Sequence, residues 1–220
     1  MLEYLATRRK APEGLADRVV AWLGEREAAK DPRIDARAEL FRLLVALDRA
    51  EALEKTLVGW IRPEEADLTW RLALAYLQAE TGRLPEAVAT LETASSLGDL
   101  PPDAWSLLAN GYLVAKEDAR RESALERALE AQGDGPLNQR LWQEASRMER
   151  SGPGVPAELD PEILRVLRVY LRTTERPAQA LSHPERLYRA TKDFRLLESL
   201  ADGVVGHTPE AVYDFVGRVG

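Results

Sequence analysis

Proline and glycine residues divide this chain into short helix-forming segments, and this punctuation constrains the fold more than any other feature. Between the breaks, apolar residues recur with helical spacing. In the stretch WSLLANGY, Trp105, Leu108, Ala109 and Tyr112 stand at offsets 0, 3, 4 and 7, which places them on one helical face. Runs of alternating β-branched residues, the pattern of half-buried strands, are missing. We therefore predict an all-α protein.

The breaks also set the ends of the expected helices. Asp103 and Asp160 are typical helix caps, and Pro161 suits a first helical turn. The stretch that begins SGPGVPAE, residues 151–159, has Gly and Pro without apolar periodicity, so we expect a linker or a long inter-helix loop there. The expected helices are Leu2–Arg9, Leu15–Ala29, Ile34–Leu47, Ala50–Ile61, Asp67–Ala79, Leu84–Leu97, Ala104–Ala115, Arg120–Gln132, Asn138–Arg150, Asp160–Thr173, Pro184–Thr191, Phe194–Val205 and Pro209–Val216.

Two residue types recur at a similar interval along these helix pairs. Trp residues at 70, 105 and 142 are spaced by 35 and 37 residues. Ala residues at 16, 52, 87 and 124, each early in the second helix of a pair, are spaced by 36, 35 and 37 residues. A recurrence of this length is typical of stacked helical repeats.

The residues of this recurrence resemble the tetratricopeptide repeat, whose pattern is Trp-x2-Leu-Gly-x2-Tyr, then Ala-x3-Phe, then Pro. The best match covers Asp67–Pro136, and both of its units have a longer inter-helix turn than the family pattern. The later unit matches with Trp105, Leu108, Ala109, Tyr112, Ala124, Ala128, Ala131 and Pro136 as terminator. The earlier unit matches with Leu72, Ala73, Tyr76, Gly82, Ala87, Leu91 and Ala94, while Trp142, Ala145 and Ser146 begin a weaker third match.

The resemblance implies a right-handed α-solenoid of antiparallel helix pairs. Residues 1–150 would form tetratricopeptide-like repeats, and residues 160–220 would form further helical hairpins that continue the solenoid. Compact residues at helix crossings, Ala73, Ala87, Ala109 and Ala124, would let the backbones approach closely, and Tyr76, Trp105 and Tyr112 would fill the space between pairs. A non-repeating helical bundle is the alternative, because it also places alanines at crossings and aromatics in its core.

Composition excludes several classes of function. The formal net charge of −7 and a pI near 5.1 disfavour general nucleic-acid binding. The chain has no Cys, which removes disulfides, thiolate metal sites and a Cys nucleophile. The N-terminus lacks a signal-peptide core, and the longest aliphatic run, Leu43–Leu47, is too short to span a bilayer, so a cytoplasmic location without a membrane span is expected.

Motifs for catalysis or cofactor binding are also missing from the sequence. There is no P-loop and no GxSxG elbow, and no strand precedes a glycine-rich loop. The two histidines, His183 and His207, stand in turn contexts beside proline and lack a metal-ligand pattern. We expect ordinary loop histidines, no metal, no cofactor, no small-molecule substrate and no enzyme activity.

Candidate binding residues come from three places in the chain. Arg165, Arg168 and Arg172 line one face of a helix and could bind acidic side chains of a partner; the alternative is a solvated face that keeps the helix soluble. Asn110 follows the small Ala109, where a groove asparagine would stand in the family. Tyr76 and Trp142 complete the set of groove candidates.

These features predict a non-catalytic protein–protein interaction scaffold that binds a partner protein or peptide on the concave face of a helical-repeat solenoid. One alternative is a helical regulatory or substrate-positioning domain of a larger enzyme, and another is a nucleic-acid-binding helical repeat. The apolar stripe of Val212, Phe215 and Val216 in the last expected helix favours a chain that continues beyond Gly220. The sequence does not specify the oligomeric state.

Overall fold

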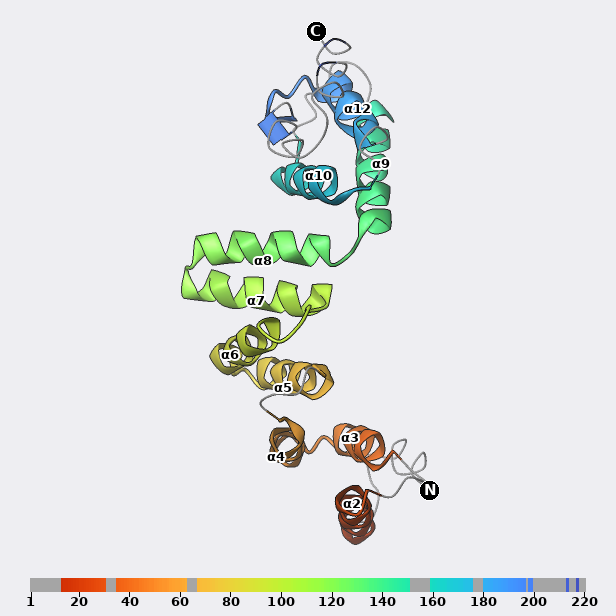
Figure 1. Ribbon diagram of the computed structural model, residues 1–220, viewed down its shortest axis with the longest axis vertical. Helices are drawn as coiled ribbons and strands as arrows, with labels where there is room; N and C mark the ends of the chain where they lie inside the picture. The colour runs from red at the N-terminus through yellow and green to blue at the C-terminus, as the bar shows by residue number, and fades with distance from the viewer. Residues whose placement is uncertain are drawn as a thin grey trace. The chain divides into compact units, whose positions relative to one another are not determined.

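The computed structural model describes residues 13–30, 35–62, 67–150, 159–175, 180–196 and 198–199, together with residues 213 and 217. These residues are mostly helical and include no strand, which confirms the all-α prediction. The chain forms two compact units, Met1–Gly98 (unit 1) and Asp99–Gly220 (unit 2). The helices are α2 (Glu13–Ala28), α3 (Ala36–Ala46), α4 (Ala50–Trp60), α5 (Thr69–Glu80), α6 (Leu84–Ser95), α7 (Pro102–Ala115), α8 (Asp118–Glu130), α9 (Asp134–Arg150), α10 (Pro161–Thr173) and α12 (Ser182–Thr191) (Figure 1).

Several expected segments lie outside the described residues. They are the first expected helix, Leu2–Arg9, most of the expected linker, and the last expected helix, Pro209–Val216, with its apolar stripe. Of the expected helix Phe194–Val205, residues 195–196 and 198–199 are described and helical.

Side chains and prolines explain where two of the helices begin. The Asp160 carboxylate accepts a hydrogen bond from the Glu162 backbone N–H at 2.8 Å, and Pro161 occupies the first turn of α10, as predicted. The predicted cap of α7 is wrong. This helix begins at Pro102 and not after Asp103, since proline is well tolerated in a first turn where its missing N–H would have no helical partner.

The same tolerance corrects the role of Pro136. It was expected to end a helix pair, but it lies in the first turn of α9, which begins at Asp134. A proline ends a helix only where its ring would clash with the preceding turn, and a first turn has no such neighbour.

Three helix pairs share one inter-helix turn. They are hairpin 1 (α3 and α4), hairpin 2 (α5 and α6) and hairpin 3 (α7 and α8). In each, a residue with left-handed backbone lies two positions before the second helix: Asp48 (φ 55°), Gly82 (φ 80°) and Lys116 (φ 59°). These residues are 34 apart along the chain, and so are the starts of the three second helices. The turn therefore recurs more regularly than the Trp or Ala series does.

The first helices of these hairpins keep the same 34-residue register. Leu40, Leu74 and Leu108 occupy equivalent positions and are all buried. This register corrects the alignment of hairpin 2. Its buried pair is Leu74 and Ala75, whereas the expected crossing residue Ala73 is only half-buried. Aligned on Leu74 and Ala75 in place of Leu72 and Ala73, the segment that joins the two helices of hairpin 2 is two residues shorter than the sequence alignment implied.

Most of the alanines expected at helix crossings are buried. Ala16, Ala87 and Ala124 of the recurring series are at most 2% exposed, and Ala109 is 1% exposed. Ala52 differs from them, because it is exposed on α4. The buried alanines are compatible with close helix packing. Because Ala52 is exposed, however, the four alanines of the series do not occupy equivalent structural positions.

In unit 1, aromatic rings pack where hairpin 1 meets hairpin 2. The ring centroid of Trp60, at the end of α4, lies 4.7 Å from the ring centroid of Trp70 on α5. The ring centroid of Phe41 on α3 lies 5.9 Å from that of Trp70. The Arg83 guanidinium at the start of α6 forms two hydrogen bonds, of 2.7 and 2.9 Å, with the Glu54 carboxylate on α4. Large rings and a forked ion pair thus join adjacent hairpins within this unit.

Unit 2 has a larger apolar core, to which α8, α9, α10 and α12 contribute. Hairpin 3 is an antiparallel pair whose helices lie side by side (Figure 1). Helix α10 packs against both α8 and α9, and α12 packs against α9. The buried side chains of α10 are Ile163, Leu164, Val166, Leu167, Val169, Tyr170 and Leu171.

Candidate binding surface

Two of the predicted groove residues, Tyr76 and Asn110, occupy equivalent positions in their hairpins. They are 34 residues apart on the first helices α5 and α7. Asn110 is exposed, and Tyr76 is half-buried. The equivalent residue of hairpin 1 is Arg42, which is exposed on α3 and which the sequence did not single out. The position is therefore polar or aromatic in all three hairpins.

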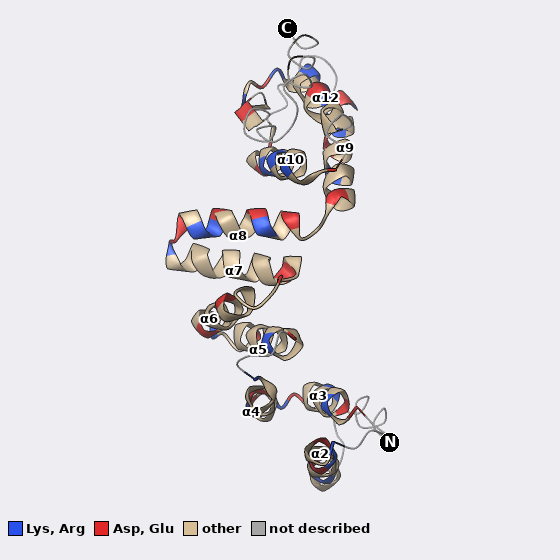
Figure 2. Ribbon diagram, in the orientation of Figure 1, with Lys and Arg blue, Asp and Glu red and all other residues tan. Residues whose placement is uncertain are grey.

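Exposed aliphatic residues lie one turn further along the same helices. Val45 of hairpin 1 and Leu113 of hairpin 3 are equivalent and are 52% and 50% exposed, and Val114 is 71% exposed. Helix α7 is drawn almost wholly in the colour of uncharged residues, and Asp103 in its first turn is its one acidic or basic residue (Figure 2). Aliphatic surface with little charge is typical of protein contact sites.

The arginine stripe of α10 has acidic partners within unit 2. Arg165 donates to the Glu122 carboxylate of α8 from Nε at 3.1 Å and from Nη2 at 2.6 Å. Arg172 donates to Glu126 at 3.2 Å and to Glu130 at 2.6 Å. The predicted ability of this stripe to bind carboxylates is therefore used inside the chain, where it joins α10 to α8.

The ion pairs also affect the pKa of one arginine of the stripe, Arg172. Burial lowers the pKa of Arg172, but the hydrogen bonds that its guanidinium donates to Glu130 and Glu126 outweigh this effect, so its pKa lies above the ordinary value. Arg168, between the two paired arginines, is half-buried, and its Nε has no hydrogen-bond partner among the described residues. The stripe is thus an inter-helix contact and not an open basic face.

Trp142 lies on α9, outside the 34-residue register, and is 56% exposed. Its neighbours one turn away on each side contact α12. The Oδ1 atom of Asn138 is 2.6 Å from Nε2 of His183, and Ser146 Oγ accepts a hydrogen bond of 3.3 Å from Arg186. His183 is buried near the start of α12, so its interpretation as a loop histidine is wrong, while His207 lies outside the described residues.

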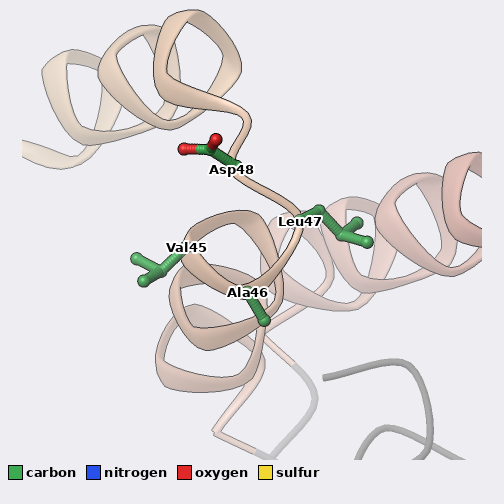
Figure 3. Close-up of a pocket in the computed structure, with 4 residues that line it drawn as sticks. All are labelled: Val45, Ala46, Leu47 and Asp48. Carbon is green, nitrogen blue, oxygen red and sulfur yellow. The ribbon is translucent and has the colours of Figure 1, made fainter. Parts of the chain in front are cut away.

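A pocket of about 400 Å³ is lined by Val45, Ala46, Leu47 and Asp48 at the end of α3. These four side chains point in different directions and do not converge on a common point (Figure 3). The described part of the chain also has no group of three or more His, Cys, Asp or Glu residues placed to hold a metal ion.

Within the same described ranges, every helix is too short or too polar to cross a membrane. No family model, curated protein or solved structure matches the chain.

Proposed function

We propose that the chain is a non-catalytic scaffold that binds a partner protein or peptide on the concave face of a right-handed, tetratricopeptide-like α-solenoid. The observation that supports this most strongly is the 34-residue recurrence of one turn, at Asp48, Gly82 and Lys116. This interval equals the length of the tetratricopeptide repeat. The buried leucines at equivalent positions of the three first helices support the same assignment.

Regular stacking of the hairpins would gather equivalent residues on one face of the array. Within unit 1, this would place Arg42 of hairpin 1 beside Tyr76 of hairpin 2, with Val45 one turn further along α3. Asn110 is the equivalent residue of hairpin 3, and these three residues are here called the first-helix row. Asn110 has an amide that can hydrogen-bond a peptide backbone, and Leu113 and Val114 offer apolar contact area. Trp142 is a further candidate contact, separate from this row.

The character of this row favours an apolar polypeptide over a nucleic acid as the partner. Phosphate binding needs free lysines and arginines. The arginines of α10 that could have supplied them, Arg165 and Arg172, are neutralised by glutamates of α8. The uncharged exposed side chains of α7, such as Leu113 and Val114, instead match aliphatic side chains of a partner.

Site-specific photo-crosslinking tests this proposal. A photoreactive phenylalanine analogue is placed singly at Tyr76 and Asn110, and at two control positions, Thr93 on α6 and Arg127 on α8, which are exposed on second helices. In the native lysate, the two first-helix positions should form adducts with the same polypeptide, identified by mass spectrometry, and the controls should not. Equal yields from the controls, or no adduct from either first-helix position, would contradict the assignment.

A further inference from the structure

His183 joins α12 to two other helices of unit 2. Its side chain is buried, with 5% exposure, near the start of α12. The Nε2 atom lies 2.6 Å from Asn138 Oδ1 on α9. The imidazole ring also meets the ring of Tyr170 on α10 in an edge-on contact, with 5.8 Å between centroids. The position of α12 therefore depends on an imidazole that contacts both α9 and α10.

The hydrogen bonds around His183 suit only the neutral imidazole. Because Asn138 Oδ1 can only accept, Nε2 bears the proton and Nδ1 is left with a lone pair. This Nδ1 is buried and has no hydrogen-bond partner among the described residues. Protonation would create a buried donor without an acceptor and a charge in an apolar core, and both are costly.

The charged groups around the imidazole add to this cost. Burial first, and then the positive charge of Arg186 on the same helix, hold the pKa of His183 below its ordinary value. From α9, the Glu149 carboxylate binds Arg186 at 2.8 and 2.9 Å, and this hydrogen bond lowers the pKa of Glu149, so it stays ionised in mild acid. From α10, the facing group is the neutral Tyr170. Within the described structure, these groups supply no free carboxylate to compensate an imidazolium.

We propose that His183 is a pH-sensitive latch, whose protonation releases α12 from α9 and α10. Released α12 binds a proton more readily than packed α12, so packing is complete above the ordinary His range, near pH 6.5. The packing of α12 is lost as the pH falls from the ordinary histidine pKa toward the lower pKa that His183 has when α12 is packed. Release would expose Leu187, which is fully buried on α12, and the face of Tyr170 that it covers. Mild acid would thereby uncover apolar surface in unit 2.

Hydrogen exchange of the full chain, measured by mass spectrometry between pH 7.5 and pH 5 and corrected for intrinsic rates, tests this latch. The background is His207→Gln, which removes the only other imidazole in the chain. In that background, the amides of α12 should lose protection as the pH falls, while those of hairpin 3 should not. His183→Gln keeps a donor near the place of Nε2 and cannot titrate, so its α12 should show no such change.

Asn138→Asp is the opposite change, because it places a carboxylate beside Nε2. It should keep α12 protected at pH 5, and the His183 resonance in a proton NMR titration should move to a higher midpoint. Three results would overturn the proposal. They are unchanged α12 protection in the His207→Gln background, an equal loss in His183→Gln, and an equal loss in Asn138→Asp.

Discussion

Replacing Lys116 with glycine is expected to stabilise hairpin 3. Lys116 holds a left-handed conformation with φ 59°, at the position equivalent to Gly82 in hairpin 2. A residue with a Cβ costs about 1–2 kcal/mol in this region. Glycine avoids that cost but loses roughly 0.5–1 kcal/mol through the greater freedom of the unfolded chain. The free energy of unfolding should therefore rise by about 0.5–1 kcal/mol.

Gly82→Ala is the matched reverse change. Gly82 has φ 80°, and a Cβ added there would meet no atom within 4 Å. The cost is therefore conformational and not steric, and the free energy of unfolding should fall by about 1 kcal/mol. Asp48→Gly should raise stability less than Lys116→Gly, because aspartate tolerates the left-handed region better than lysine does.

Urea unfolding followed by circular dichroism measures all three variants. Each should shift the transition midpoint of its own unit without changing the slope, because the buried area is the same. If Lys116→Gly destabilises the protein as much as Gly82→Ala does, the two positions do not share a turn, and the 34-residue register is wrong.

Two further predictions concern packing. A double-mutant cycle with Arg165→Met and Glu122→Gln should give a coupling energy of about 0.5–1 kcal/mol, because this pair is only partly exposed; a coupling near zero would show that the contact between α10 and α8 does not depend on it. Ala124→Leu should cost roughly 1–3 kcal/mol through overpacking, whereas Ala52→Leu on the exposed face of α4 should be nearly neutral in thermal unfolding. Similar losses from the two alanines would contradict the burial pattern.

The sequence predicted helix positions better than helix register. Helix starts such as Asp160–Pro161 depend on local chemistry, which a sequence displays directly. In hairpin 2, however, Leu-Ala occurs twice in succession, at Leu72–Ala73 and at Leu74–Ala75. Leu72–Ala73 is followed by Tyr76 where the family pattern requires a tyrosine, whereas Leu74–Ala75 is followed by Gln78. The sequence therefore favoured the first pair, and only burial in the folded unit shows that the second pair occupies the position.

The shared turn gives a weak sequence signal for a similar reason. Of the three left-handed residues that define the turn, only Gly82 is a glycine. The other two are Asp48 and Lys116, and aspartate and lysine occur in helices and loops alike. The recurrence becomes visible when the backbone angles are known. The sequence did not single out Arg42 as a candidate binding residue, because only the 34-residue register of the turns shows that it is equivalent to Tyr76 and Asn110.

Long-range partners were beyond sequence reasoning altogether. The spacing of Arg165, Arg168 and Arg172 predicted a stripe that could bind acidic side chains of a partner, and in the structure Arg165 and Arg172 bind glutamates of α8. Its acidic partners, Glu122, Glu126 and Glu130, lie more than 40 residues earlier in the chain. Tertiary packing decides whether such a stripe meets its own chain or another molecule, and the local pattern is the same in both cases.

The distance between equivalent first-helix positions tests the proposed solenoid most directly. Because the chain has no native cysteine, Arg42→Cys with Tyr76→Cys gives one pair of spin labels on the first helices of hairpins 1 and 2, both within unit 1, for electron paramagnetic resonance. One stacking step of about 8–10 Å, lengthened by the label arms, predicts a single narrow distribution of distances within about 20 Å. A broad distribution, or one centred beyond about twice that length, would contradict regular stacking of these two hairpins and the binding face that depends on it.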